Sequence, residues 1–210
     1  MNKSTIDTVA ALKYFKKTDF LMYQLLKVAL KSNNPISLPK PKLQNEYFDS
    51  IVSSIVSQQI NTRAAHLIFT RIKELLSEIT PEKVLEVDLT KLKACGLSEQ
   101  KTNYIKNSAE LWNKISYRNF VQMEDEEIIT ELIRLPGIGR WTAEMFLIFS
   151  LARPDVFSFG DFGLKQSLYQ NYNYKKHWNR KIRTTVENLS PHRTLASLTL
   201  WHAKDNKRNY

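Results

Sequence analysis

Apolar residues recur along most of the chain at the three- and four-residue spacing of amphipathic helices. Tyr47–Gln59 carries such a series, made of Phe48, Ile51, Val52, Ile55 and Val56. Phe20–Lys31 places Leu21, Leu25 and Val28 on one stripe in the same way. Strand signals are sparse, because the chain has no Asn-Gly or Asp-Gly hairpin and no clean alternating run. The pattern therefore predicts an all-α protein.

Helix boundaries can be read from capping residues. Asn61 and Ser98 each precede a helical run and can act as N-caps. Thr80 precedes Pro81, which suits the first position of a helix. The three prolines of Pro35–Pro41 predict a connector. We expect residues 1–40 to form an N-terminal helical segment and linker that packs on the C-terminal lobe, and residues 41–210 to form the main domain.

The composition is that of an ordinary globular protein, with 42% hydrophobic and 25% charged residues. The net charge of +10 adds a functional indication, because a strongly basic protein attracts anionic partners. DNA, RNA and acidic membranes all fit this charge, and so does a basic protein without such a partner.

Cys95 is the one cysteine, and it excludes an internal disulfide, a four-cysteine zinc site and an iron–sulfur cluster. This usage indicates a reducing compartment, which is the cytoplasm. Met1–Thr5 lacks the apolar stretch of a signal peptide, and the apolar run Met145–Leu151 is too short to span a bilayer. We therefore expect no association with a membrane.

Four of the five glycines fall between residues 137 and 163. The first two, Gly137 and Gly139, allow a tight hairpin within Leu135–Arg140, after which a new helix runs to about Leu151. Backbone amides at such a helix start form an anion site that a DNA phosphate can fill, and Ile138 can anchor the hairpin in the core. An ordinary corner between two helices would look similar.

The second glycine pair, Gly160 and Gly163, encloses Asp161 between two phenylalanines. A helix is predicted to start directly after this aspartate. Asp161 could be an N-cap of that helix, which is the commoner role, or a functional carboxylate in an apolar cleft.

The glycine hairpin followed by Asp161 resembles the signature of the helix-hairpin-helix (HhH-GPD) DNA glycosylases, and in particular their DNA-3-methyladenine glycosylase II branch. Ser57–Asn61, Leu135–Phe146 and Asp155–Gln166 carry the resemblance, which covers roughly residues 40–205. It implies a two-lobed helical fold with a helix-hairpin-helix motif and an active site in the cleft between the lobes.

The resemblance also implies roles for single residues. Asp161 would be the catalytic carboxylate, and Gln59 would fill the gap left by a flipped base. The base pocket would be lined by Trp141, Trp201 and Phe159, although the apolar pattern around Phe159 itself favours a core position. DNA would contact Gln58, Gln59, Pro136, Gly137, Ile138, Gly139, Arg140 and Thr142. The backbone carbonyls of Ile133, Leu135 and Ile138 would hold a structural Na⁺ or K⁺.

Departures from the family pattern narrow the expectation. Bifunctional relatives carry a lysine at the position of Trp141, so no amine is placed here to form a Schiff base. The four cysteines of endonuclease III-like relatives are missing as well, so we expect neither an iron–sulfur cluster nor a catalytic cofactor. Leu189 stands where the branch often has Trp, and Asn61 where it often has Ser; their effect on substrate range stays open.

The resulting hypothesis is a monofunctional DNA glycosylase that flips out and excises alkylated bases, 3-methyladenine and related methylpurines, from double-stranded DNA during base excision repair. We expect a monomer without an obligate protein partner, in the bacterial cytoplasm at the nucleoid. Two alternatives stay open: a non-catalytic helix-hairpin-helix DNA-binding module, and a bifunctional glycosylase/lyase for oxidised bases.

Overall fold

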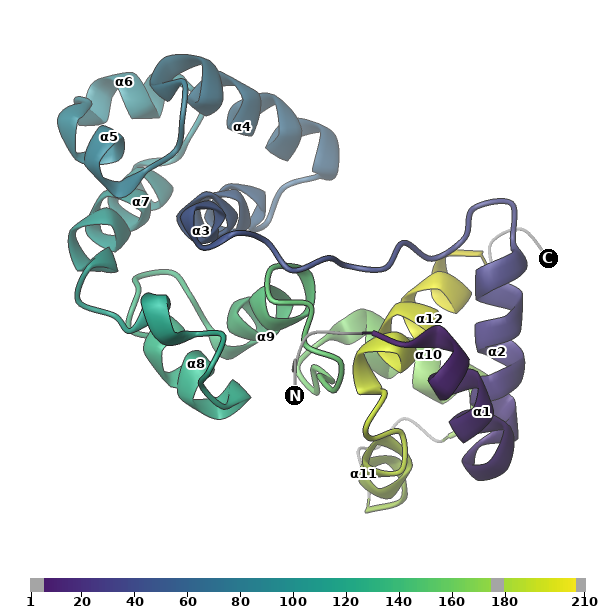
Figure 1. Cartoon of the computed structure of the whole chain (residues 1–210). Coiled ribbons are helices and arrows are strands. Elements are labelled where there is room, and N and C mark those ends of the chain that lie inside the picture. Colours follow the sequence, from purple (N-terminus) through teal and green to yellow (C-terminus); the bar gives the residue numbers. More distant parts are fainter. Residues whose placement is uncertain (1–5, 175–179, 207–210) are drawn as a thin grey trace. The chain divides into compact units, whose positions relative to one another are not determined.

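The computed structural model describes residues 6–174 and 180–206. Within these ranges the chain forms helices joined by loops and no strand, so the all-α prediction is confirmed (Figure 1). In chain order the α-helices are α1 (Thr8–Thr18), α2 (Phe20–Lys31), α3 (Tyr47–Ser57), α4 (Thr62–Leu76), α5 (Pro81–Glu86), α6 (Leu89–Ala94), α7 (Glu99–Trp112), α8 (Asp125–Leu132), α9 (Arg140–Phe149), α10 (Phe162–Asn171), α11 (Arg180–Glu187) and α12 (Arg193–Asn206). Two short 3₁₀ helices, η1 (Gln44–Glu46) and η2 (Tyr117–Asn119), complete the set.

The predicted N-caps start their helices as expected. Asn61 Oδ1 accepts a hydrogen bond from Ala64 N at 2.9 Å at the start of α4. Ser98 Oγ does the same for Lys101 N at 3.3 Å at the start of α7. The capping side chains satisfy amide groups that have no partner inside the helix, which is why local sequence could locate these starts.

The chain folds into two compact units. One unit contains the residues up to Pro41 and those from Leu147 onward, and the other is Lys42–Phe146. The first division lies beside the boundary expected near residue 40. The second lies inside α9 and divides the expected domain 41–210, so the two termini of the chain belong to one unit.

The core of the first unit joins helices from both ends of the sequence. α1 and α2 pack with α10, α11 and α12, as Figure 1 shows for the purple and yellow helices. Fully buried side chains in this core include Phe15, Met22, Leu26, Leu168 and Leu200. Burial of such apolar side chains is the main force that holds the N-terminal helices on the C-terminal ones.

The buried face of α2 differs from the stripe that the sequence suggested. Met22, Leu26 and Ala29 are fully buried, whereas Val28 is 58% exposed. The physical reason is that α2 is apolar nearly all round, so several stripes fit the helical period and tertiary packing selects one. Apolar side chains are therefore left on the outer side of this helix.

The second unit has its own core around α3. Ile51, Val52 and Ile55 are fully buried, and Ile105 of α7 and Leu132 of α8 are buried in the same unit. The Phe146 ring meets Tyr47 edge-on with centroids 5.4 Å apart, a favoured aromatic geometry. None of the described helices is long and apolar enough to cross a membrane.

Candidate active site

The glycine hairpin between α8 and α9 has the backbone that its sequence requires. Gly137 has φ of +80°, a conformation that side chains disfavour. A Cβ at Gly137 would also lie 2.4 Å from Tyr104 Cδ2, which is far inside contact distance. Ile138 is only 5% exposed and anchors the hairpin in the core of its unit, as predicted.

Gly139 differs from Gly137 in its surroundings. It lies just before α9 and is exposed, and a Cβ there would meet no atom within 4 Å. Its carbonyl accepts the Ala143 N–H at 3.0 Å and so begins the helix. The start of α9 therefore has open space through which an anion could approach the backbone amides.

Two polar side chains restrain the loop after α3, one by a bond to this hairpin and the other by bonds from α7. Gln58 Nε2 donates to the Gly137 carbonyl at 2.8 Å. Lys101 Nζ donates to the carbonyls of Val56 and Gln58 at 2.7 and 2.6 Å. These bonds satisfy carbonyls at the end of α3, and burial lowers the pKa of the Lys101 ammonium.

Gln59 follows in this loop with its side chain exposed and with φ of +58°. A left-handed backbone is uncommon for a residue other than glycine and costs of order 1–3 kcal/mol, which the surrounding bonds must offset. The predicted DNA-contacting residues Gln58 and Gln59 thus lie in one restrained loop beside the hairpin. The role of Lys101 in positioning them was not predicted, because its acceptors lie more than forty positions earlier in the sequence.

Two of the predicted DNA-contacting residues are already engaged within the protein. The Arg140 guanidinium donates to Glu144 Oε1 at 3.0 Å and to both carboxylate oxygens of Glu126. The hydrogen bonds to Glu126 raise the pKa of Arg140. Thr142 is buried, with 5% exposure. Backbone amides are therefore better placed than either side chain to meet a phosphate at this hairpin.

Asp161 has the N-cap role that its sequence allowed, and its role as a functional carboxylate stays a prediction. It is the N-cap of α10, where its Oδ1 accepts the Leu164 N–H at 2.7 Å. The same oxygen accepts the indole N–H of Trp201, from α12, at 3.0 Å. The carboxylate is only 9% exposed. These two donors fix the position of one carboxylate oxygen.

Gly163 allows the backbone of α10 to lie close to this carboxylate. A Cβ at Gly163 would lie 3.1 Å from Asp161 Oδ1, 3.3 Å from Trp201 Cδ1 and 3.3 Å from Lys204 Nζ. A side chain there would press on three groups of the site at once. Lys204 was not predicted, because a lysine in the last turn of a helix is ordinarily a surface residue.

The aromatic residues of the predicted base pocket occupy different places. Trp201 stacks on Phe149, with ring centroids 6.0 Å apart and an interplanar angle of 25°. Phe159 meets Phe157 edge-on and packs against the core of its unit, which agrees with the core interpretation of its pattern. Trp141 belongs to the other unit, where it is 46% exposed on the first turn of α9. Asp161, Trp201 and Phe149 thus form one cluster, and Phe149 had not been singled out.

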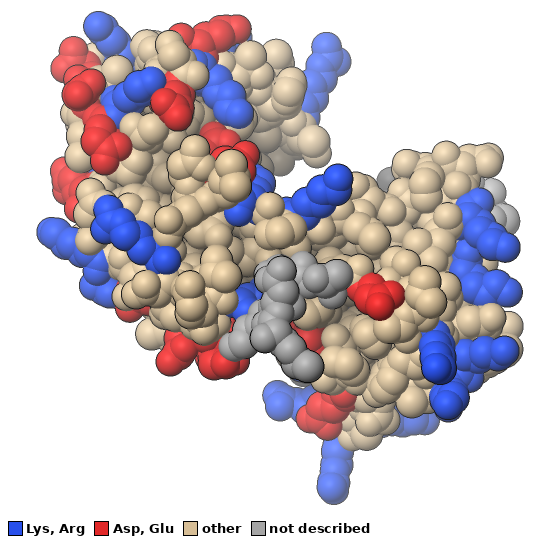
Figure 2. All heavy atoms as spheres, in the orientation of Figure 1, with Lys and Arg blue, Asp and Glu red and all other residues tan. Residues whose placement is uncertain are grey.

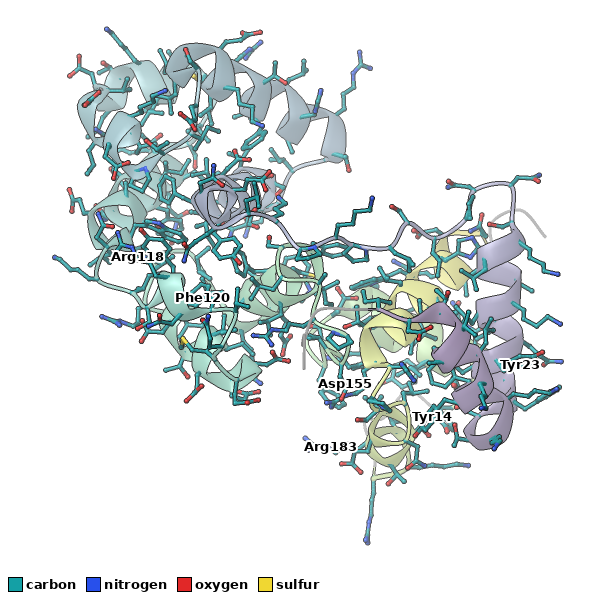
Figure 3. All side chains as sticks on the ribbon, in the orientation of Figure 1. Tyr14, Tyr23, Arg118, Phe120, Asp155 and Arg183 are labelled. Carbon is teal, nitrogen blue, oxygen red and sulfur yellow. The ribbon has the colours of Figure 1, made fainter. Side chains whose placement is uncertain are left out.

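An ion pair between Asp155 and Arg193 joins the segment before the Asp161 loop to the start of α12. Two guanidinium nitrogens of Arg193 donate to the two Asp155 carboxylate oxygens at 2.8 Å, and Ser190 Oγ donates to one of them at 2.7 Å (Asp155 is labelled in Figure 3). Burial alone would raise the pKa of the Asp155 carboxyl. The hydrogen bonds from Arg193 and Ser190 outweigh burial and lower that pKa below its ordinary value.

The hairpin and the glycine-flanked aspartate both lie in a longer stretch of the chain that matches a known protein family. Residues 52–192 match the family model described as HhH-GPD superfamily base excision DNA repair protein. The chain therefore belongs to the HhH-GPD superfamily.

Within this superfamily the chain is similar to DNA-3-methyladenine glycosylases. It is 34% identical over 170 residues to DNA-3-methyladenine glycosylase 1 of Schizosaccharomyces pombe, a match covering 75% of this chain and 72% of that protein. Among solved structures, DNA-3-methyladenine glycosidase from Bacillus halodurans matches with a TM-score of 0.80 and 31% identity, covering 95% of this chain and 92% of the other. The S. pombe 3-methyladenine DNA glycosylase in complex with abasic DNA matches with a TM-score of 0.72 and 28% identity, covering 94% and 97%.

Proposed function

We propose that this protein is a monofunctional DNA glycosylase that excises alkylated bases such as 3-methyladenine from double-stranded DNA in base excision repair. The observation that carries the proposal is the position of the Asp161 carboxylate. It accepts a hydrogen bond from the Trp201 indole, and the Trp201 ring stacks on Phe149. The similarity to DNA-3-methyladenine glycosylases across most of the chain supports it.

Binding begins at the phosphate backbone. The amides at the start of α9 are presented by a hairpin with open space at Gly139, and such contacts position a protein on DNA without reading its sequence. The damaged nucleotide must then leave the base stack, because its glycosidic bond cannot be reached inside the duplex. Gln59, exposed on a restrained loop, is suited to fill the gap that remains.

Selection of the base follows from its charge. A base such as 3-methyladenine is cationic in DNA, and the face of an aromatic ring attracts a cation by about 0.5–2 kcal/mol. Trp201 and Phe149 offer such faces beside Asp161, and Trp141 offers another on α9. A cationic base is also a good leaving group, so its departure requires little protonation by the protein.

Cleavage of the glycosidic bond develops oxocarbenium character on the deoxyribose. The bond electrons leave with the base, and water adds to the anomeric carbon. A carboxylate can stabilise the positive sugar, accept a proton from the water, or do both. The bonds from Leu164 and Trp201 hold Asp161 Oδ1 in place before the reaction starts, so little reorganisation is needed.

The proposal also includes a monovalent cation at the hairpin. The carbonyls of Ile133, Leu135 and Ile138 would hold a Na⁺ or K⁺, since carbonyl oxygens replace the water shell of such ions. The Leu135 carbonyl accepts the Ile138 N–H at 3.1 Å and keeps a second lone pair for an ion.

We propose that the protein needs no catalytic cofactor, and that it acts as a monomer in the cytoplasm.

The test is release of free base from methylated duplex DNA by the wild type and by Asp161→Asn. The asparagine oxygen can still accept from Leu164 N and Trp201 Nε1, so the loop keeps its bonds while the negative charge is lost. We expect turnover to fall at least about 10²-fold, with unchanged affinity for DNA, because charge stabilisation in the transition state is lost.

Asp88→Asn is a matched control, since Asp88 is an exposed N-cap without a side-chain capping bond. Normal excision by Asp161→Asn would contradict the mechanism. Absence of excision by both the wild type and Asp161→Asn, with DNA binding intact, would favour a binding module. Trapping with borohydride separates the third possibility, because only an enzyme that forms a Schiff base becomes crosslinked to DNA.

A further inference from the structure

The N-terminal helices carry a basic surface that the glycosylase site does not use. α1 and α2 lie outside residues 52–192, the part that matches the family model. Together they present Lys13, Lys16, Lys27 and Lys31, all exposed. Figure 2 shows Lys and Arg side chains gathered along the edge where Figure 1 places α2.

These lysines surround a shallow groove of about 380 Å³ between α1 and α2. Its floor is formed by Leu12, Tyr23 and Leu30, which are half-buried. We call the floor and the four lysines the lysine groove. Tyr23 is labelled in Figure 3, on the outer side of α2. An apolar floor ringed by cations is suited to an apolar side chain with acidic neighbours.

No acidic side chain lines the groove or pairs with its lysines among the described residues. The two aspartates next to these helices serve as caps instead. Asp7 accepts from Val9 N and Ala10 N. Asp19 accepts from Met22 N and from the Tyr172 hydroxyl. Lys27 Nζ lies 5.4 Å from the centroid of the Tyr23 ring, but no carboxylate among the described residues neutralises the charge of the groove, which can therefore attract an external partner.

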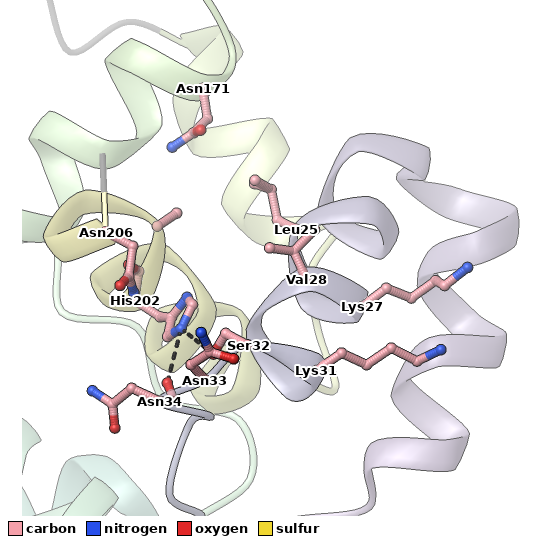
Figure 4. A pocket seen from close by; sticks show the side chains of 11 residues that line it. Leu25, Lys27, Val28, Lys31, Ser32, Asn33, Asn34, Asn171, His202 and Asn206 are labelled. Carbon is pink, nitrogen blue, oxygen red and sulfur yellow. Dashed lines mark hydrogen bonds between the residues drawn. The ribbon is translucent and has the colours of Figure 1, made fainter. Parts of the chain in front are cut away.

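A larger pocket elsewhere on α2 contains two of the four lysines of the groove. It has a volume of about 1000 Å³, and His202 inside it bonds to Ser32 Oγ and the Asn34 carbonyl (Figure 4). Lys27 and Lys31 line both this pocket and the lysine groove.

We propose that the lysine groove binds an acidic peptide segment of another protein, with an apolar residue of that segment on Leu12, Tyr23 and Leu30. The charge of the groove would equally attract a DNA backbone. Phosphates and sugars, however, offer no apolar group to cover the floor, whereas a peptide supplies both kinds of contact. This partner would bring the repair enzyme to a site of action without occupying its catalytic residues.

The test uses the full chain and a short labelled synthetic peptide in which aspartates flank a Leu–Phe pair. Binding is followed by fluorescence anisotropy for the wild type and for Lys13→Glu/Lys27→Glu, two changes in the middle of exposed helical faces. We expect the double variant to weaken binding about tenfold or more, since attraction is replaced by repulsion. Lys91→Glu/Lys114→Glu, at two exposed lysines of the other unit, is the matched control and should bind as the wild type does.

Two altered peptides test the charged and the apolar contacts separately. Asparagines in place of the aspartates, or serines in place of Leu–Phe, should each abolish most of the binding. Equal binding by the groove variant and the control, or indifference to the Leu–Phe pair, would overturn the proposal. If Lys13→Glu/Lys27→Glu instead weakens binding to undamaged duplex DNA and leaves the peptide unaffected, the groove is a DNA surface. Excision activity should be unchanged in all these variants, so the outcome is independent of the proposed function.

Discussion

At the scale of single residues, Asp161 shows why a sequence can offer two interpretations of one side chain. Its place before a helix indicates an N-cap, and its glycine and phenylalanine neighbours indicate a functional carboxylate. The N-cap is confirmed, because Asp161 Oδ1 accepts the Leu164 amide. The functional carboxylate stays a prediction, which the bond from the Trp201 indole to the same oxygen supports. The sequence could not reveal the second bond, because Trp201 lies forty positions further along the chain.

Asp155 provides a prediction about pH. Its pKa is lowered in the folded protein, so its contribution to stability is fully present above the ordinary carboxyl pKa of about 3.9. That contribution is lost as the pH falls through the lowered value. We expect Asp155→Asn to reduce the free energy of unfolding by about 1–3 kcal/mol near neutral pH, because bonds to a charged group are lost.

The difference between the wild type and Asp155→Asn should shrink as the pH falls below about 4. Chemical denaturation at neutral and acidic pH measures it. A difference that stays constant over this range would show that the Arg193–Asp155 ion pair is not what the variant loses.

At the scale of elements, the two hairpin glycines have separate reasons to be glycine. Gly137→Ala combines a left-handed backbone with a clash against Tyr104, so we expect a loss of about 1–3 kcal/mol or more in stability. Gly139→Ala meets open space, so its cost should stay within about 1 kcal/mol, the effect of alanine at a helix start.

The same pair of variants tests the hairpin as a phosphate site. Thermal unfolding measures the change in stability of each variant. Titration with undamaged duplex measures the change in its affinity for DNA. Gly139→Ala should weaken DNA binding despite near-normal stability, because a methyl group would obstruct the approach to the α9 amides. Unchanged DNA affinity in a folded Gly139→Ala protein would place the phosphate elsewhere.

Helices themselves were predictable because their signals are local. The caps at Asn61 and Ser98 and the run of apolar residues in α3 lie within a few residues of the structure they specify. The buried face of α2 was not predictable, because an almost wholly apolar helix leaves the choice to distant packing. The bond from Gln58 to Gly137 joins residues 79 positions apart, so it too depends on tertiary packing and was not predictable from local sequence.

At the scale of the whole molecule, charge and chain topology act together. The net charge of +10 predicts that the logarithm of the affinity for undamaged duplex falls linearly with the logarithm of salt concentration, since phosphate contacts release counterions. Anisotropy measured over a series of salt concentrations gives the slope. Affinity that does not respond to salt would exclude backbone phosphates as the main contact.

The division into units shows which parts of the chain share a core. The residues up to Pro41 fold with those from Leu147 onward, around a shared core that includes Phe15 and Leu200. The apolar faces of the N-terminal helices are buried against α10, α11 and α12, in the part of the chain on which residues 1–40 were expected to pack. The site residues Asp161 and Trp201 are therefore supported by a core that requires both ends of the polypeptide.

The bonds of Trp201 have a consequence for what kind of base this site can distinguish. An indole ring has a single N–H, and Trp201 donates it to Asp161. One face of the ring is covered by Phe149. A base that meets this ring would contact an aromatic surface without a free donor, and such a surface cannot read the pattern of donors and acceptors along the edge of the base. We expect such a surface to rank lesions by electron deficiency and flatness, so one enzyme would act on chemically unrelated lesions that have only a weakened bond to the sugar in common.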